Sequence, residues 1–202
     1  MGQYYKPCSL DKKEYVYSWD YNSGLKLMEH SWRKNDFVNT VAGLIAKGGA
    51  WFGDRIVWAG DYADPEIPNI PNPENDDKPM NLFDICRDTN KINPVIPKRT
   101  YKYFLNLDTN EFVDINKCPE EEDGWNIHPL PLLTCEGNGR GRGDFHREHP
   151  MIGKWARCRV VASFTKPKKG VEIFPDFTEQ DEVKKIAVKK KEARQLRPDI
   201  TL

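Results

Sequence analysis

The sequence predicts an α+β fold: a mainly antiparallel sheet with one packed helix and a charged C-terminal helix. Three observations predict it. Short segments rich in aromatic and β-branched residues alternate with turn-forming residues, as antiparallel strands do. One segment has apolar residues at helical spacing. A last segment is rich in Glu, Lys, Ala and Arg and lacks Gly and Pro. The 202 residues fit one domain and can bury a core without disulfides or metals.

The first third of the chain predicts three short strands, at Tyr4–Cys8, Glu14–Ser18 and Leu25–His30. The segments Ser9–Lys12 and Tyr21–Asn22–Ser23–Gly24 separate them and have the composition of turns. We therefore expect the chain to begin with a meander of strands.

A helix is predicted from about Lys34 to Lys47 and a central strand at Asp54–Gly60. Apolar residues in the helical segment recur at three- and four-residue spacing, and Gly48 follows its end. The spaced residues are Phe37, Val38, Val41, Leu44 and Ile45. The strand segment is almost continuously apolar, which is typical of a strand in the middle of a sheet.

The middle of the chain predicts a long surface loop at Asp64–Pro79 and then a hairpin of Tyr101–Leu107 and Glu111–Ile115. An acidic loop follows at Cys118–Trp125. Pro129 and Pro131 interrupt the apolar segment Ile127–Cys135, which we therefore expect to be extended or at a sheet edge.

The last predicted strand is Ala156–Phe164, and a charged helix is predicted at Glu179–Leu196 with Thr178 as its N-cap. We expect a single α+β domain over residues 1–166 and a charged helical extension over residues 167–202. Lys and Arg concentrate toward the end of that helix, as in a solvated helix with a favourable dipole.

Basic and acidic residues number 31 each, so no overall charge favours nucleic acid or an anionic membrane as a partner. The five cysteines are widely spaced without a CxxC pair, which indicates reduced thiols. No segment has the apolar length of a signal peptide or a membrane span. We expect a cytoplasmic protein without a membrane partner, and the sequence leaves a homo-oligomer open.

The segment Glu136–Asp144, here called the Gly/Arg loop, is the first candidate site. Four glycines alternate in it with Asn138, Arg140 and Arg142; the glycines are Gly137, Gly139, Gly141 and Gly143. Alternating glycines let backbone N–H groups approach a ligand, and arginine binds phosphate or carboxylate through two hydrogen bonds. The loop lacks the lysine of a Walker A motif and the third glycine of a dinucleotide motif. It predicts an anion site without naming a cofactor.

Asp61 and Asp64 directly follow the predicted central strand, where carboxylates can accept from a ligand's hydroxyls or act as a general base. His128 and His146 flank the Gly/Arg loop. No HExxH motif or zinc spacing of Cys and His occurs, so we expect neither a metal nor another cofactor. A strand-ending turn is the alternative explanation for the two aspartates.

A third candidate is Trp19–Asp20, where an aromatic ring and a carboxylate precede a turn. Such a pair can stack on and hydrogen-bond a base or a sugar. Core packing and turn capping are the alternative. Cys135 is the one thiol within the candidate site, and a small buried cysteine is its ordinary explanation.

Several strings resemble an uncharacterised family of bacterial and bacteriophage proteins. They are Met1–Tyr5, Gly24–His30, Arg55–Asp64, His128–Thr134 and Glu136–Arg140. The resemblance runs from residue 1 to about Val161 and carries no established activity. It implies that Arg140 is a better anion contact than Arg142, because the family often has glycine at the latter position.

These observations predict binding of a small anionic ligand, phosphorylated or nucleotide-like. Arg140 and backbone N–H groups would hold the anion, and Asp61, Asp64 or Asp20 would accept from hydroxyls. In a phage such a protein could sequester a host signalling nucleotide. A hydrolase acting on a similar ligand with acidic and histidine residues is the second hypothesis. A protein-interaction module using Trp residues and Pro-rich loops is the third. The sequence does not decide whether the protein is an enzyme.

Overall fold

The computed structural model describes residues 3–66, 70–73, 78–86, 90–118, 126–137 and 150–174. These form an α+β fold on a mixed nine-stranded sheet of order β4-β2-β1-β3-β8-β5-β6-β9, in which β7 also pairs with β3. Five described strand pairings are antiparallel and three are parallel. The predicted α+β class is confirmed. The helix predicted at Glu179–Leu196 lies outside the described residues.

The strands are β1 (Tyr5–Ser9), β2 (Glu14–Tyr15), β3 (Arg55–Gly60), β4 (Asn90–Lys91), β5 (Tyr103–Asn106), β6 (Glu111–Asp114), β7 (Cys135–Glu136), β8 (Cys158–Ser163) and β9 (Val171–Glu172). The helices are η1 (Ser18–Tyr21), α1 (Leu27–His30), α2 (Asp36–Ile45), α3 (Leu82–Ile85), η2 (Ile115–Lys117) and α4 (Pro129–Thr134).

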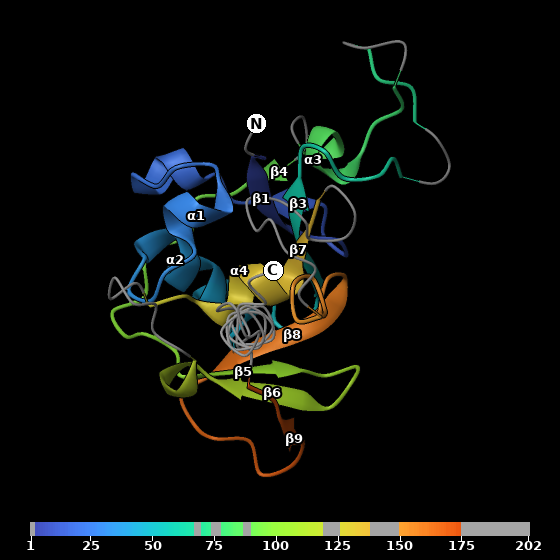
Figure 1. Ribbon diagram of the computed structural model, residues 1–202. Helices are drawn as coiled ribbons and strands as arrows, with labels where there is room; N and C mark the ends of the chain where they lie inside the picture. Colours follow the sequence, from blue (N-terminus) through green and yellow to red (C-terminus); the bar gives the residue numbers. More distant parts are fainter. Residues whose placement is uncertain are drawn as a thin grey trace, which may run out of the picture.

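Strand β8 joins the two halves of the sheet. Figure 1 shows β1, β3 and β7 above β8, and β5, β6 and β9 below it. Strand β8 pairs with β3 at Ile56↔Cys158 and with β5 along Tyr103–Asn106. Strand β9 pairs with β6, so the sheet extends beyond residue 166.

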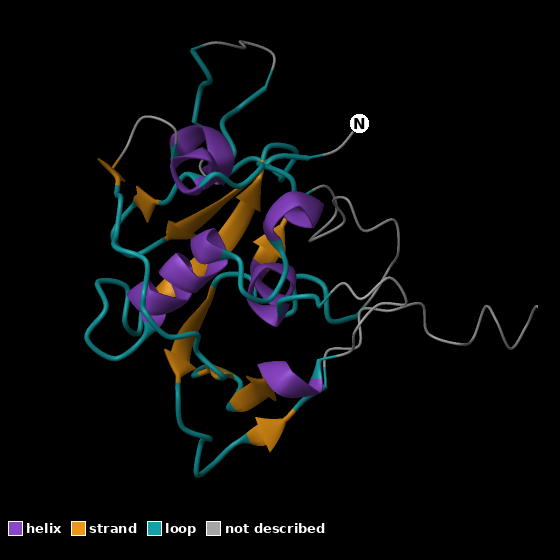
Figure 2. Cartoon of the chain, turned by 90° about the vertical axis from the view of Figure 1, so that its left-hand side faces the viewer, coloured by secondary structure: helices purple, strands orange, loops and turns teal. Residues whose placement is uncertain are grey.

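The helices lie unequally on the two faces of the sheet. One face packs against α1, α2 and α4 and contains the larger core, with Trp51, Trp58 and Trp155 fully buried. Figure 2 looks from the side of α1 and α2 and shows helices in front of the strands. The other face packs against α3 and contains a smaller cluster that includes Cys8 and Cys86.

The predicted helix and central strand are confirmed as α2 and β3. Helix α2 begins after Asn35, whose side chain accepts a hydrogen bond from the Val38 N–H at 3.1 Å. Strand β3 pairs with β1, β7 and β8 and is buried from Ile56 to Gly60. The predicted hairpin is also present, as β5 and β6.

The strand predicted at Leu25–His30 is wrong, because Leu27–His30 forms the single-turn helix α1. The Glu29 carboxylate accepts from the Lys26 N–H at 3.0 Å and caps the first turn. This capping hydrogen bond stabilises a turn too short for periodicity to reveal. The end of the strand predicted at Glu14–Ser18 also differs, since η1 begins at Ser18.

The extended segment predicted at Ile127–Cys135 is wrong as well, because Pro129–Thr134 forms α4. The His128 Nδ1 caps this helix by accepting from the Leu130 N–H at 3.1 Å. Pro129 and Pro131 both lie in the first turn, where backbone N–H groups have no partner within the helix. Proline therefore starts this helix instead of breaking it.

Candidate functional site

The carboxyl ends of β3 and β7 meet at one edge of the sheet. The two strands are parallel, with Ala59 opposite Glu136, and both end within one residue of that pair. We call Gln3, Gly60, Asp61, Asp64, Glu136 and Gly137 the β3–β7 edge. It includes the first two residues of the Gly/Arg loop and both aspartates that follow the central strand.

Gly60 and Gly137 are in direct contact at this edge. A Cβ atom on Gly60 would lie 3.0 Å from the Gly137 Cα. A Cβ atom on Gly137 would lie 2.6 Å from the Tyr5 hydroxyl oxygen and would also collide with the Gln3 side-chain oxygen. The segment that begins at Asp61 and the start of the Gly/Arg loop therefore lie side by side. Close packing explains the glycine at position 137 without a ligand.

Asp61 and Asp64 have different surroundings. The Asp61 carboxylate accepts from the Tyr4 N–H at 3.1 Å, and the Asp61 N–H donates to the Tyr4 carbonyl at 3.0 Å. Asp61 therefore fastens the start of β1 to the end of β3, which is a turn-like structural role. Asp64 is exposed, and its carboxylate can accept hydrogen bonds from a ligand.

Arg157 forms a half-buried ion cluster with two glutamates beneath this edge. Its Nε donates to Glu136 Oε2 at 2.6 Å, and its Nη1 donates to Glu66 Oε2 at 3.1 Å. The hydrogen bonds that Arg157 donates to Glu136, and then those to Glu66, raise the pKa of Arg157, although burial lowers it. The cluster ties β7 and the segment after β3 to the start of β8. Because the single positive charge of Arg157 is paired with two carboxylates, the cluster has no net positive charge to attract an anionic ligand.

Replacing Arg157 with methionine is expected to destabilise the fold by about 2 kcal/mol, because Glu66 and Glu136 keep their charges without a partner. Arg157 has a φ of 64°, and methionine is strained there equally, so the substitution isolates the charge. Urea unfolding measures the loss. The control is Arg159→Met, which removes an exposed pair with Asp108. Equal losses in both variants would contradict a special role for the cluster.

The structure places His128, a predicted ligand contact, and the neighbouring Cys135 in the core. His128 is 2% exposed, caps α4 and lies edge-on to Phe104 at 5.0 Å between ring centroids. Burial lowers the pKa of His128 to about 3 and raises the pKa of the Cys135 thiol to about 12. Their burial explains His128 as the cap of α4 and Cys135 as a small core residue.

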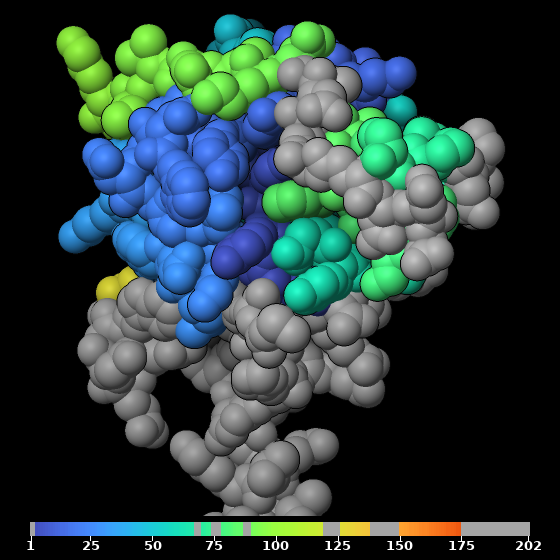
Figure 3. Space-filling view, turned by 90° about the horizontal axis from the view of Figure 1, so that it is seen from above, coloured from blue at the N-terminus to red at the C-terminus, as the bar shows by residue number. Residues whose placement is uncertain are grey.

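Trp19 and Asp20 do not lie at the β3–β7 edge. They belong to η1, and the Asp20 carboxylate pairs with the Lys91 ammonium on β4 at 3.0 Å. Figure 3 shows the start of the chain, in dark blue, between the lighter blue atoms of the residues that follow it and the teal and green atoms of the segment after β3. The described residues of the three candidates therefore lie in two separate places.

Four predicted contacts lie outside the described residues: Asn138, Gly139, Arg140 and Asp144. The same holds for His146. Within the described ranges, no three His, Cys, Asp or Glu side chains gather as metal ligands would. The described helices also include none with the length and apolarity to cross a bilayer.

Sequence patterns did not single out Glu66, Arg157 or Lys91. The glutamate and Arg157 are 91 residues apart, so their pairing carries no local signal. Comparisons with family models, curated proteins and solved structures give no match to this chain. Function is therefore inferred from the geometry of the described residues and from the sequence.

Proposed function

We propose that the protein binds a small anionic, nucleotide-like ligand at the β3–β7 edge through the Gly/Arg loop. The observation that supports this most directly is the parallel pairing of β3 and β7, which brings Asp61 and Asp64 to the start of the Gly/Arg loop. Two parallel strands end there side by side, and each is followed by polar residues suited to a ligand. Ligands commonly bind outside the carboxyl ends of neighbouring parallel strands.

Charge at the edge restricts how an anion binds. Asp61, Asp64, Glu66 and Glu136 are acidic, and Arg157 is already paired with two of them. An anion placed here needs positive charge from elsewhere, because unscreened carboxylates repel it. The Gly/Arg loop carries that charge in its sequence, as Arg140 and Arg142. The exposed Asp64 then suits a hydroxyl of the ligand.

The expected result is that a nucleoside phosphate raises the melting temperature of the wild-type protein and that Arg140→Ala weakens its binding at least about tenfold. A thermal-shift panel of nucleoside mono-, di- and triphosphates and cyclic dinucleotides identifies the probe. Isothermal titration then measures Kd for the variants. Arg142→Ala is the matched control, since it removes the same charge from the same loop and is expected to retain most of the affinity.

The same panel separates the alternatives. Turnover of the nucleotide that requires Mg²⁺ and is lost in Asp64→Asn would favour the hydrolase. Equal weakening in the Arg140 and Arg142 variants would indicate general electrostatic attraction in place of a defined contact. A folded wild-type protein that responds to no nucleotide would refute the proposed ligand and leave the protein-interaction module.

A further inference from the structure

Two cysteines, Cys8 on β1 and Cys86 directly after α3, meet in the smaller core cluster. Their side chains are 0% and 2% exposed. The two thiols lie within hydrogen-bonding reach of each other, and both are reduced in this structure. The other buried members of the cluster are Tyr15, Val57, Ala59 and Leu82. A thiol pair that the fold brings together from distant positions is a candidate for disulfide chemistry.

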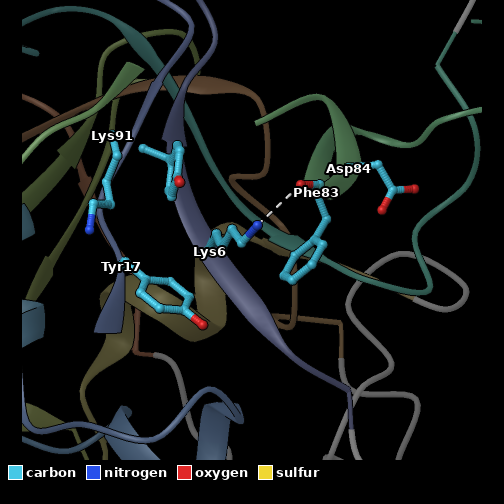
Figure 4. A pocket seen from close by; sticks show the side chains of 6 residues that line it. Lys6, Tyr17, Phe83, Asp84 and Lys91 are labelled. Carbon is cyan, nitrogen blue, oxygen red and sulfur yellow. Dashed lines mark hydrogen bonds between the residues drawn. The ribbon is translucent and has the colours of Figure 1, made fainter. Parts of the chain in front are cut away.

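The packing of α3 on β1 explains why the thiols meet. Lys6 and Cys8 are two positions apart on a strand, so their side chains point to the same face of the sheet. Phe83 and Cys86 are three positions apart around one helical turn, so they also share a face. The Lys6 ammonium lies 3.8 Å from the centroid of the Phe83 ring and donates to the Phe83 carbonyl at 3.4 Å, as Figure 4 shows. With Lys6 against Phe83, the next residues on the two faces are Cys8 and Cys86.

The two thiols differ in acidity. Burial raises the pKa of Cys8 well above its ordinary value. The hydrogen bond with Cys8 lowers the pKa of Cys86 against the effect of burial, and the positive charge of Lys6 also lowers it. By contrast, burial raises the pKa of Cys118 and of Cys135 to about 12. Because the thiolate is the reactive form, Cys86 is the attacking sulfur and Cys8 is the thiol that completes the bond.

A pocket of about 360 Å³ lies beside the thiol pair. Tyr15, in its wall, is the strand partner of Cys8, and Phe83, also in its wall, lies one helical turn before Cys86. The full lining is Lys6, Tyr15, Tyr17, Phe83, Asp84 and Lys91. Neighbours of both thiols therefore border a cavity that a small molecule can enter. Thiols this deeply buried favour an oxidant close to water in size, such as hydrogen peroxide.

We propose that Cys8 and Cys86 form a reversible disulfide with hydrogen peroxide as the oxidant, and that this bond fastens α3 to β1. The effect extends to the segment after β3, which α3 holds through Asn81. The Asn81 side-chain amide donates to the Asp61 carbonyl at 3.0 Å and to the Ala63 carbonyl at 3.3 Å. The disulfide forms whether or not the Gly/Arg loop binds a ligand.

The reaction proceeds in two displacements. The Cys86 thiolate attacks one peroxide oxygen, so that an S–O bond forms and the O–O bond breaks. The leaving hydroxide takes up the proton that Cys86 released, which yields water and a sulfenic acid on Cys86. The Cys8 sulfur then attacks Cys86 Sγ, the S–O bond breaks, and the second hydroxide leaves as water with the Cys8 proton. Two thiols are thereby oxidised to one disulfide, and one hydrogen peroxide is reduced to two waters.

Peptide mapping of the full-length protein under non-reducing conditions tests the bond. Reduced protein is treated with hydrogen peroxide, catalase removes the excess, and the remaining thiols are alkylated in urea. Two of the five thiols are expected to be lost. Mass spectrometry is expected to find the Cys8 peptide joined to the Cys86 peptide, and dithiothreitol is expected to restore all five thiols. The melting temperature of the oxidised protein is expected to be about 5 °C higher than that of the reduced protein.

Alanine variants then assign the two sulfur atoms. Cys86→Ala is expected to abolish both the cross-link and the rise in melting temperature. Cys8→Ala is expected to leave Cys86 as a sulfenic acid that dimedone labels, because the thiol that completes the bond is missing. Cys118→Ala is the matched control, since Cys118 is buried in the larger core, and this variant is expected to cross-link as the wild type does. If a variant fails to fold, the peptide map of the wild-type protein decides.

Three results would overturn the proposal. One is a folded wild-type protein that keeps all five thiols after peroxide treatment. Another is a cross-link that joins other cysteines or two separate chains. The third is a Cys8–Cys86 cross-link that forms equally fast in protein unfolded by urea, because the fold would then not cause the pairing. None of these measurements involves a nucleotide, so this proposal and the proposed ligand site succeed or fail separately.

Discussion

Lowering the pH from about 7 to about 5 is expected to destabilise the protein by about 4 kcal/mol, and two buried histidines are the cause. His30 is fully buried, and burial lowers its pKa to about 4. His128 is 2% exposed, and burial lowers its pKa to about 3. In the unfolded chain both titrate near their ordinary value of 6.5.

The hydrogen bonds of the two imidazoles explain why they stay neutral. His30 Nε2 accepts from the Trp58 indole N–H at 3.1 Å, and its Nδ1 lies 2.9 Å from the Gly24 carbonyl, to which it donates. His128 Nδ1 accepts from the Leu130 N–H. A proton on either accepting nitrogen would place a donor against a donor. Protonation therefore requires these contacts to break.

The direction of the effect follows from where the proton binds. Below about pH 6.5 the two histidines bind protons in the unfolded chain but stay neutral in the folded protein. The free energy of unfolding therefore falls as the pH falls. The loss extends downward until the folded pKa values of about 4 and about 3 are reached. Each histidine contributes about 2 kcal/mol between pH 7 and pH 5.

Urea unfolding at several pH values measures this dependence. The matched variant is His128→Asn, because asparagine can still cap α4 but does not titrate. It is expected to lose about half of the pH dependence. An unchanged dependence in this variant would show that other groups control acid unfolding.

Replacing Gly49 with alanine is expected to destabilise the fold by about 3 kcal/mol or more, because the new methyl group has no space. It would lie 2.6 Å from the Leu44 carbonyl carbon and inside contact distance of the Gly43 and Leu44 carbonyl oxygens. These are backbone atoms at the end of α2, which cannot rotate away as a side chain can. The Leu44 carbonyl also accepts from the Trp51 N–H at 2.9 Å, and Trp51 is fully buried.

Gly48 is the matched control for this prediction. It has a φ of +88°, but a Cβ atom there would meet nothing within 4 Å. Gly48→Ala is therefore expected to cost about 1 kcal/mol through backbone strain alone. Chemical denaturation of the two variants distinguishes crowding from strain. If Gly48→Ala were the more damaging substitution, crowding at the end of α2 would not be the dominant effect.

Sequence patterns predicted the elements that bury many residues in a regular order. Helix α2 matches the segment with apolar residues at helical spacing, and strand β3 matches the continuous apolar run. Strand β8 lies within the predicted Ala156–Phe164. Such elements are stabilised along their whole length, so several residues carry the same signal.

The wrong predictions concern single turns, whose existence depends on one cap. The Glu29 side chain determines α1, and His128 with Pro129 determines α4. A single capping hydrogen bond stabilises a helix by about 1 kcal/mol. Its signal is one residue, so a prediction from the pattern of apolar residues overlooks it. The two-residue strands β4, β7 and β9 are shorter still and depend on partners far along the chain.

The candidate site also divides into features with a local sequence signal and features that depend on distant contacts. Residues that follow β3 and β7 could be singled out because they lie in unusual local strings. Their proximity could not be deduced, since it depends on a parallel pairing between residues 58 and 135. The pocket lined by Lys6, Phe83 and Lys91 could not be predicted at all, because these residues meet only in three dimensions.

The place of β8 in the sheet has a consequence for synthesis on the ribosome. Strands β3 and β5 are both made before β8, and each pairs with it only after Ser163 has left the exit tunnel. Until then the nascent chain has two partial sheets, each with an unpaired strand edge. Such edges are prone to pair with other chains. We therefore expect the nascent protein to depend most on chaperones just before residue 163 emerges. We expect that dependence to fall once β8 pairs with β3 and β5.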